Sequence, residues 1–278
     1  MSVDRIRVQP IAAFKDNYIW MLHDGRRAAV VDPGVTAPVV KALEGQRLEL
    51  SAILLTHLHS DHNWGVPGLL ELQPVPVFGP LLNEHDRGSH PPFPKPGTVP
   101  LDCVTHVVDD GDAVTLEALD TELSVIAVPG HTRGHLAFLE RSRGWLFTGD
   151  TLFGGGCGKV FGGSMQAMVD SLDRLARLPP QTQVYCAHEY TLDNLRFALA
   201  VEPTNRDLAA RFEAETRKRE QGLPTLPSTI GLERATNPFL RVLEPEVLGT
   251  LKARRGVAAG TRAASLEALR EWKNDFKA

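Results

Sequence analysis

The segment 56–62, which reads THLHSDH, constrains the fold of this chain more than any other feature. It follows an apolar run and offers four potential metal ligands, namely His57, His59, Asp61 and His62. If the run is a buried strand, its end aims the loop at one point. Imidazole nitrogens combined with carboxylate oxygens suit Zn, Fe, Mn or Co. The segment therefore predicts a metal-binding loop at a strand end, in preference to a polar turn with surface histidines.

Three further strand-like runs end in a residue that can bind a metal. These runs deliver His131, Asp150 and His188. Because ligands at the ends of several strands converge on one edge of a sheet, we expect them to meet the cluster in 56–62. Seven ligands exceed the needs of one tetrahedral zinc. The pattern predicts two ions about 3.5–4 Å apart, with a shared carboxylate or hydroxide offsetting their repulsion.

Short apolar runs and helical patterns alternate up to about residue 190. The strand-like runs are 28–34, 51–57, 122–131, 144–150 and 183–188, and the helical patterns are 37–45, 63–73 and 165–179. Strands mixed with helices predict an α/β fold in which sheets and helices form layers.

The character of the sequence changes after Tyr190, where it becomes helical, charged and poor in β-branched residues. We therefore predict two domains, a main domain over 1–190 and a small helical domain over 191–278. The segment 84–106 is rich in proline and polar residues, which predicts a long surface loop or insertion.

Composition narrows the class of protein. The chain is 42% hydrophobic and 23% charged, which is typical of a globular protein with a sizeable core. Its formal net charge of -4 argues against a general nucleic-acid-binding surface. The N-terminus lacks the pattern of a secretory signal, and no run approaches the about 18 apolar residues of a membrane span. The three cysteines are an odd, sparse set that is typical of reduced thiols. We expect a cytoplasmic monomer with a small-molecule partner.

The series THLHSDH, His131, Asp150 and His188 resembles, in order, the ligand series of the metallo-β-lactamase superfamily. This resemblance implies an αβ/βα sandwich. It also implies that one metal is held by His57, His59 and His131, and the other by Asp61, His62 and His188. Asp150 would bridge the two metals.

Within that superfamily the chain resembles the glyoxalase II, or hydroxyacylglutathione hydrolase, family over almost its whole length. The matching motifs are FKDNYIW (14–20), GHTRGH (130–135), FTGDTLF (147–153), GCGK (156–159), YCAHEYTLDNLRFA (185–198), VEPTN (201–205), NPFLR (237–241) and REWKNDF (270–276). The resemblance implies hydrolysis of S-D-lactoylglutathione to D-lactate and glutathione, in methylglyoxal detoxification. A hydroxide bridging two divalent ions would attack, with Asp61 and Asp150 in the catalytic centre. Zinc is expected, with iron or manganese as alternatives.

The same resemblance implies a helical glutathione-binding domain. The glutathione contacts would be Lys159, Tyr190, Arg270 and Lys273. Arginine and lysine suit this task because they form charge-assisted hydrogen bonds with carboxylates. The chain departs from the family at Phe161, where a tyrosine is usual. Loss of that hydroxyl predicts binding weaker by about 0.5–1.5 kcal/mol, or a different thiol carrier.

Other functions and roles stay open on sequence grounds. The rival activities are a glutathione persulfide dioxygenase with a single iron and a nuclease of the same superfamily. A catalytically silent metal-binding module is the rival from another class. Asp32 has two interpretations, as a turn former before proline or as a hydrogen-bond partner of a ligand histidine. His135 likewise has two, as a group that orients a ligand or as a core or capping residue.

Overall fold

The computed structural model describes residues 6–81, 103–161, 163–256 and 260–276. The chain divides into two compact units. The first comprises Met1–Ala127 and Thr132–Gly149, and the second comprises Val128–His131 and Asp150–Ala278. The division predicted at residue 190 separates a main domain from a small helical domain by their expected functions. It stays a prediction.

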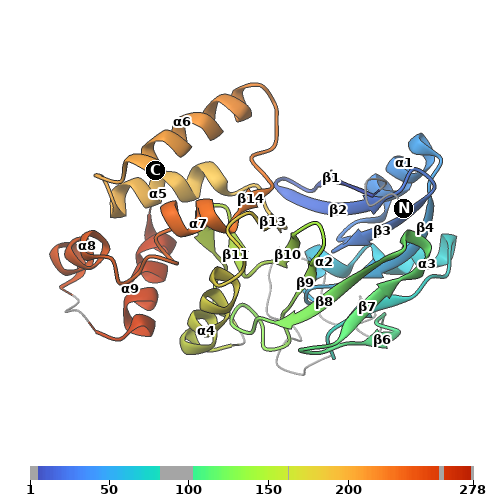
Figure 1. Ribbon diagram of the computed structural model, residues 1–278, viewed down its shortest axis with the longest axis horizontal. Helices are drawn as coiled ribbons and strands as arrows, with labels where there is room; N and C mark the ends of the chain where they lie inside the picture. The colour runs from blue at the N-terminus through green and yellow to red at the C-terminus, as the bar shows by residue number, and fades with distance from the viewer. Residues whose placement is uncertain (1–5, 82–102, 162, 257–259, 277–278) are drawn as a thin grey trace. The chain divides into compact units, whose positions relative to one another are not determined.

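The first unit contains a six-stranded sheet in the order β1-β2-β3-β4-β5-β6 (Figure 1). Its strands are β1 (Arg7–Ala13), β2 (Asn17–His23), β3 (Arg27–Val31), β4 (Glu49–Leu54), β5 (Val77–Gly79) and β6 (His106–Val107). The first three strands pair antiparallel, and β3 to β6 pair parallel. Parallel neighbours need crossovers. The helix α1 (Thr36–Gln46) joins β3 to β4, and α2 (Ser60–Asn63) and α3 (Val66–Leu72) join β4 to β5.

An antiparallel run of four strands follows in the same unit. It comprises β7 (Ala113–Leu116), β8 (Thr121–Ala127), β9 (Leu136–Glu140) and β10 (Trp145–Gly149), with the short 3-10 helix η2 (Glu117–Leu119) between β7 and β8. Each strand pairs with the next. All five residues of β9 are buried, as expected for an inner strand covered on both faces.

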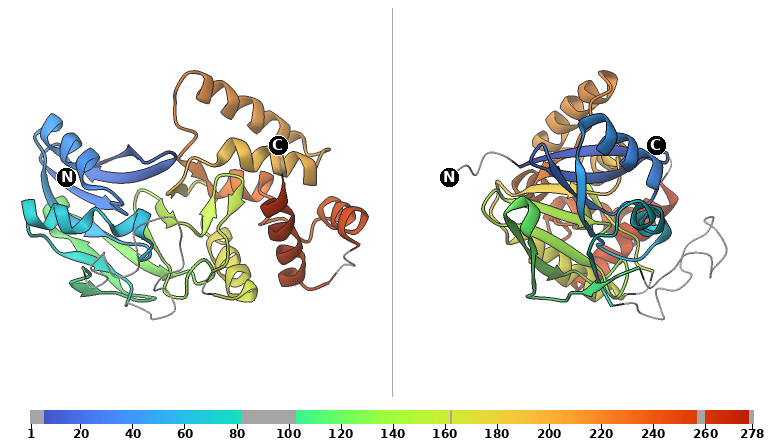
Figure 2. Two further views of the ribbon diagram at one scale, coloured as in Figure 1. Left: turned by 180° about the vertical axis from the view of Figure 1, so that it is seen from behind. Right: turned by 90° about the vertical axis from the view of Figure 1, so that its right-hand side faces the viewer.

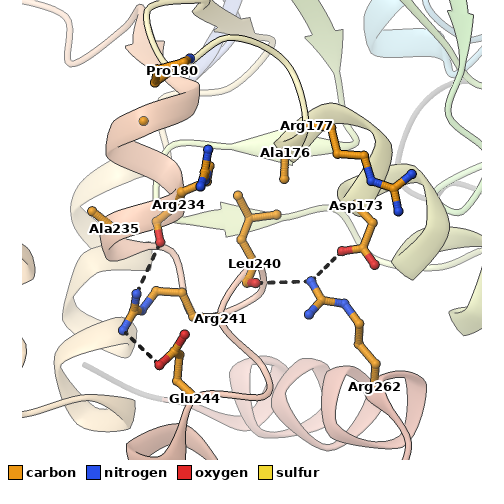
Figure 3. Close-up of a pocket in the computed structure, with 11 residues that line it drawn as sticks. Asp173, Ala176, Arg177, Pro180, Arg234, Ala235, Leu240, Arg241, Glu244 and Arg262 are labelled. Carbon is orange, nitrogen blue, oxygen red and sulfur yellow. Dashed lines mark hydrogen bonds and ion pairs between the residues drawn. The ribbon is translucent and has the colours of Figure 1, made fainter.

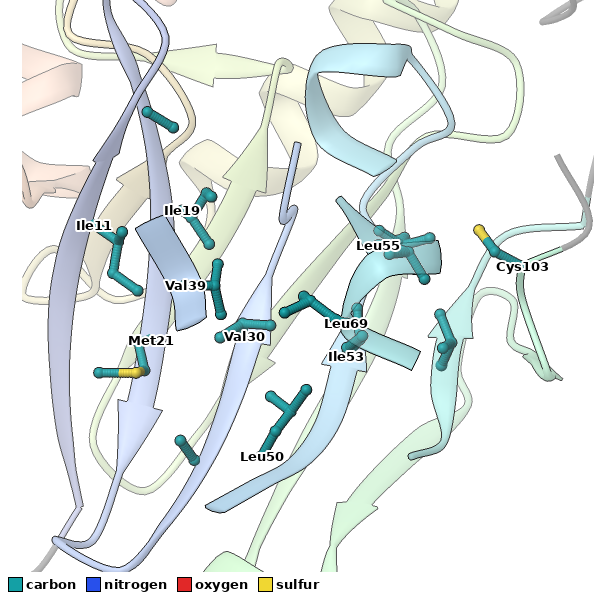
Figure 4. Close-up of a cluster of buried hydrophobic side chains, with 14 of the residues drawn as sticks. Ile11, Ile19, Met21, Val30, Val39, Leu50, Ile53, Leu55, Leu69 and Cys103 are labelled. Carbon is teal, nitrogen blue, oxygen red and sulfur yellow. The ribbon is translucent and has the colours of Figure 1, made fainter. Parts of the chain in front are cut away.

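The core of the first unit lies between the first sheet and its crossover helices (Figure 4). Ile19 and Met21 of β2 point to the same face because strand side chains alternate, and they join Val39 of α1 and Leu69 of α3. Cys103 belongs to this cluster. Burying an aliphatic side chain of this size contributes about 1.5–3 kcal/mol, so the cluster fixes the sheet from which the ligand loops emerge.

The second unit begins with short strands and continues as helices. Its elements are β11 (Leu152–Phe153), β12 (Gly156–Cys157), α4 (Met165–Ala176), β13 (Gln183–Cys186), α5 (Thr191–Val201), α6 (Arg206–Glu220), β14 (Ser228–Thr229), α7 (Ile230–Thr236), α8 (Pro245–Arg255) and α9 (Arg262–Asp275). Figures 1 and 2 show α5 and α6 side by side. Three helices begin at residues that favour a helix N-terminus. The side chains of Ser164, Asn205 and Thr261 accept hydrogen bonds from backbone N–H groups in the first turns of α4, α6 and α9.

A buried polar network ties the helices of the second unit to the turn between β11 and β12. The Arg211 guanidinium of α6 lies 2.6 Å from the Glu233 carboxylate of α7, and both side chains are almost fully buried. Glu233 also accepts from Gly155 N at 2.8 Å and from Asn237 Nδ2 at 2.9 Å. The Asn237 amide donates in turn to Gly156 O at 2.9 Å. The helical part of the chain therefore fixes the turn that precedes Lys159.

The predicted strands and helices are confirmed, and one expectation was wrong. Residues 84–102 of the predicted loop lie outside the described residues. Its last residues depart from a surface loop at two positions: Cys103 is buried, and His106 pairs with Phe78 in the first sheet. The Thr105 hydroxyl accepts from Val77 N at 2.9 Å, which sets this pairing. No helix among the described residues is long and apolar enough to cross a membrane.

Candidate metal centre

The first unit brings together the four ligands predicted in 56–62. β4 ends at Leu54, and the loop that follows leads into α2. His57, His59 and His62 are buried. The His57 Nε2 and His59 Nδ1 atoms lie 3.0 Å apart, and His62 Nε2 lies 3.5 Å from Asp61 Oδ2. Imidazole and carboxylate groups this close form a donor set that fits a divalent transition metal.

Asp32 orients these ligands from the end of β3. Its carboxylate accepts from Thr56 N at 2.8 Å and from the Thr56 hydroxyl at 2.7 Å, and it lies 3.1 Å from His62 Nδ1. A carboxylate on one ring nitrogen of a histidine fixes its tautomer and leaves the other nitrogen for a metal. Asp32 adopts a left-handed backbone conformation, with φ of 55°, which aims its side chain at Thr56 and His62. The interpretation of Asp32 as a histidine partner is therefore the correct one.

His135 packs against the ring of His57, one of the predicted ligands. Its imidazole is buried and stacks on that of His57, with ring centroids 4.6 Å apart and an interplanar angle of 22°. The stacked ring limits how far His57 can tilt. The sequence left open whether His135 is a core residue or a group that orients a ligand. This one contact combines both roles.

Two residues that sequence reasoning missed position Asp61. The Asn17 Nδ2 atom donates to Asp61 Oδ2 at 3.2 Å. A Cβ atom at Gly34 would lie 1.8 Å from the Asp61 carbonyl oxygen, so only glycine allows the backbone of α2 to approach there. Asn17 lies within the motif FKDNYIW, which was the signal available in the sequence.

The second unit assembles the other three ligands around Asp150. The Asp150 Oδ2 atom lies 3.5 Å from His131 Nε2, and Oδ1 lies 3.4 Å from His188 Nε2. Each carboxylate oxygen thus faces a different histidine, an arrangement that suits a carboxylate shared by two cations. His131 Nδ1 donates to the Lys159 carbonyl at 2.8 Å, which leaves Nε2 available to a metal.

The GCGK turn is held tightly against these ligands. A Cβ atom at Gly158 would lie 2.0 Å from the Asp150 carbonyl oxygen and 3.1 Å from His131 Nδ1. Glycine is therefore required for the close approach. Burial raises the pKa of the Cys157 thiol, while the Arg270 charge opposes that shift. A protonated, buried thiol is a poor nucleophile, which favours metal chemistry over cysteine chemistry here.

Two of the predicted glutathione contacts flank the ligands of the second unit. Lys159, the last residue of the GCGK turn, is exposed. The Tyr190 ring stacks on His188, with centroids 4.7 Å apart and an interplanar angle of 5°. Phe161 is 42% exposed and presents its ring edge-on to His131 at 5.3 Å. A tyrosine at position 161 would therefore carry a hydroxyl on an exposed ring beside the His131 imidazole.

The other two predicted contacts have partners within the second unit. Arg270 is only 9% exposed, and its guanidinium donates to Cys157 O at 2.8 Å and lies over the Phe239 ring. Lys273 donates to Asp193 O at 2.8 Å. Burial, helped by the neighbouring Arg270 charge, lowers the pKa of Lys273 to about 8. Glutathione binding by these two residues stays a prediction.

Comparison with known proteins agrees with the fold and the donor groups. Residues 14–188 match the metallo-beta-lactamase superfamily, and residues 189–276 match the hydroxyacylglutathione hydrolase C-terminus. The crystal structure of TTHA1623 in a di-iron-bound form is 25% identical, with a TM-score of 0.56, over 84% of this chain and 100% of that one. The chain has the α/β fold and the histidine and aspartate groups of a metal-binding metallo-β-lactamase-superfamily protein, as predicted.

Full-length relatives narrow the class further. The hydroxyacylglutathione hydrolase of Cupriavidus taiwanensis is 48% identical over 98% of this chain and 100% of that protein. That of Pseudomonas putida is 47% identical over the same shares. The chain belongs to the hydroxyacylglutathione hydrolase family, the glyoxalase II family that its motifs resemble.

Proposed function

We propose that this enzyme hydrolyses the thioester S-D-lactoylglutathione to D-lactate and glutathione, as a step in methylglyoxal detoxification. The observation that carries the proposal is the match of residues 189–276 to the hydroxyacylglutathione hydrolase C-terminus. A metallo-β-lactamase fold by itself hosts many chemistries, so the substrate has to be argued from the additional helical region. The high identity to relatives with that name, over nearly the whole chain, points the same way.

The proposed site holds two divalent ions, with zinc expected and iron or manganese as alternatives. One ion would be bound by His57, His59 and His131, and the other by Asp61, His62 and His188, with Asp150 between them. The donor types and the two-sided placement of the Asp150 carboxylate support this assignment. A solved structure with 25% identity is in a di-iron-bound form, which supports the number of ions. Nitrogen and oxygen ligands bind these metals with overlapping geometry, so the donor set alone does not select one.

Bound metals would supply a hydroxide nucleophile near neutral pH and polarise the thioester carbonyl. The residues of the chain prepare this chemistry. Asp61 and Asp150 are the carboxylates of the catalytic centre. Asp32 holds His62, and the Lys159 carbonyl holds His131, so each imidazole presents a fixed nitrogen. Such preorganisation removes the reorganisation cost at the moment of reaction.

Glutathione would dock on Lys159, Tyr190, Arg270 and Lys273, which assigns substrate binding to the helical domain 191–278 and to the edge of the catalytic domain 1–190. Three of these groups are cationic, and the substrate carries carboxylates. We expect the protein to act as a monomer in the cytoplasm. We expect neither a nucleic-acid nor a membrane partner.

The decisive experiment compares S-D-lactoylglutathione with a lactoyl thioester of another thiol, on one sample whose metal content is measured. Turnover confined to the glutathione ester, with about two metals per chain, is the expected result. Equal turnover of both esters would contradict the assigned glutathione contacts. No turnover, with one iron bound and oxygen consumed on glutathione persulfide, would replace the hydrolase with the dioxygenase. Absence of any turnover would favour a silent metal-binding module.

A further inference from the structure

A hollow of about 880 Å³ lies within the second unit, and its lining includes none of the proposed metal ligands or glutathione contacts. It is bounded by the end of α4, by α7, by the segment after α7 and by the start of α9 (Figure 3). Its volume lies within the range of about 300–1,000 Å³ that is usual for small-molecule sites. The hollow therefore has room for a ligand much larger than a single inorganic ion.

Four arginines and two carboxylates line this hollow. The arginines are Arg177, Arg234, Arg241 and Arg262, and the carboxylates are Asp173 and Glu244. The whole chain carries a formal net charge of -4, so this lining has the opposite sign to the chain. A local surplus of positive charge attracts anions and costs free energy in their absence.

Two of the four arginines, Arg241 and Arg262, are already neutralised by carboxylates and held by hydrogen bonds. The Arg241 guanidinium makes three hydrogen bonds of 2.9–3.0 Å to the buried Glu202 carboxylate. Arg262 lies 2.6 Å from Asp173 and donates to Leu240 O at 3.1 Å. Figure 3 shows Arg262 held in this way between Asp173 and Leu240. These pairs leave little cationic character for an incoming ligand at these two residues.

Arg177 and Arg234 are the uncommitted pair. Both are exposed, and neither guanidinium forms an ion pair or hydrogen bond with another residue in the described ranges. One follows α4 and the other belongs to α7, so they approach the hollow from different elements. The rest of the lining includes apolar groups from Ala176, Ala235 and Leu240. The hollow thus combines two free planar donors with an apolar surface.

We propose that this hollow binds a small organic dianion, whose charged oxygens are held by Arg177 and Arg234 and whose apolar body rests on Leu240 and the two alanines. Guanidinium groups suit this ligand because their paired N–H donors match the oxygens of a phosphate monoester or a carboxylate. Arginine also stays charged at every pH at which the protein is folded. Binding here is independent of thioester hydrolysis.

The test is calorimetric titration of the metal-loaded full chain with phenyl phosphate, and separately with succinate. The two probes distinguish a phosphate monoester from a dicarboxylate as the preferred dianion. The variant Arg177→Gln/Arg234→Gln removes both free guanidiniums. The control Arg206→Gln/Lys252→Gln removes the same charge from two exposed residues that do not line the hollow. Any binding of the probes to the metals is common to all three proteins and cancels in the comparison.

We expect the affinity for at least one probe to fall by about tenfold or more in the arginine variant, because charge-assisted hydrogen bonds are lost. The control should stay within about twofold of the parent protein, since exposed charges at a distance are screened. Equal affinity in the two variants, or no binding of either probe to the parent at millimolar concentration, would overturn the proposal. Circular dichroism verifies folding, and both replaced arginines are exposed, so the arginine variant is expected to fold.

Discussion

Replacing Glu233 with glutamine tests whether the buried pair in the second unit holds the helical region to the active-site turn. Glu233 and Arg211 are both almost fully buried, with their charged atoms 2.6 Å apart. In the Glu233→Gln variant the shape of the side chain is kept but the guanidinium is left without its counter-charge. Breaking a buried pair by neutralising one partner costs about 3–5 kcal/mol. We expect a loss of that size in the free energy of unfolding of the second unit.

The assay is equilibrium unfolding in urea, followed by a signal from Trp272 in α9, which belongs to the second unit. The control is Glu213→Gln on the neighbouring helix α6, where Glu213 and Arg217 are 3.9 Å apart and mostly exposed. An exposed pair of this kind contributes about 0–1 kcal/mol, so the control should unfold almost like the parent. A double variant, Arg211→Met/Glu233→Gln, removes both charges and should lose less than the sum of the single changes.

Equal midpoints for Glu233→Gln and Glu213→Gln would refute this reasoning. The same variant reports on the active site, because Glu233 also accepts from Gly155 N at 2.8 Å and thereby anchors the turn that precedes Lys159. We therefore expect the KM for the glutathione thioester to rise under conditions in which the variant is still folded.

Four further predictions concern the metal and substrate residues. Asp150→Ala should abolish both hydrolysis and stoichiometric metal content; retention of both would disprove its role. Asp32→Asn should weaken metal affinity by about 10–100-fold in a competitive chelator titration, whereas Asp24→Asn in an exposed turn should not. The KM should rise as pH passes about 8, where folded Lys273 loses its proton, and Lys273→Arg should remove that rise. The same lowered pKa means that burying charged Lys273 costs stability below about 8, and that stability recovers as pH rises toward the unfolded pKa of 10.5. Phe161→Tyr should lower KM by a factor corresponding to about 0.5–1.5 kcal/mol with kcat unchanged; an unaltered KM would mean that the hydroxyl contacts nothing.

The two free arginines and the proposed metal ligands illustrate different kinds of sequence signal. His57, His59, Asp61 and His62 lie close together in the chain, so their shared role is visible from spacing alone. Arg177 and Arg234 lie 57 positions apart in the chain and line the same hollow only because of how α4 and α7 pack. Nothing in either local sequence distinguishes them from other exposed arginines.

The sequence by itself determined the strands and the helices, and it predicted the ligand set. Each ligand lies at the end of an apolar run, and both the run and the ligand type are local properties of a few consecutive residues. Resemblance to a family added the substrate class through the C-terminal motifs. The sequence also indicated, without deciding, that Asp32 could support a histidine.

Tertiary structure alone decided which distant groups hold those ligands in place. Asn17 bonds Asp61, the Lys159 carbonyl bonds His131, and Glu233 anchors Gly155 across a separation of 78 residues. It also placed Cys103 in the core and His106 in a sheet, against a local composition that predicted a loop. Such contacts depend on how the elements pack, because a hydrogen bond or a close approach requires two particular atoms to lie near each other in the folded protein. Propensity and spacing describe only neighbours along the chain, and so they carry no information about these partners.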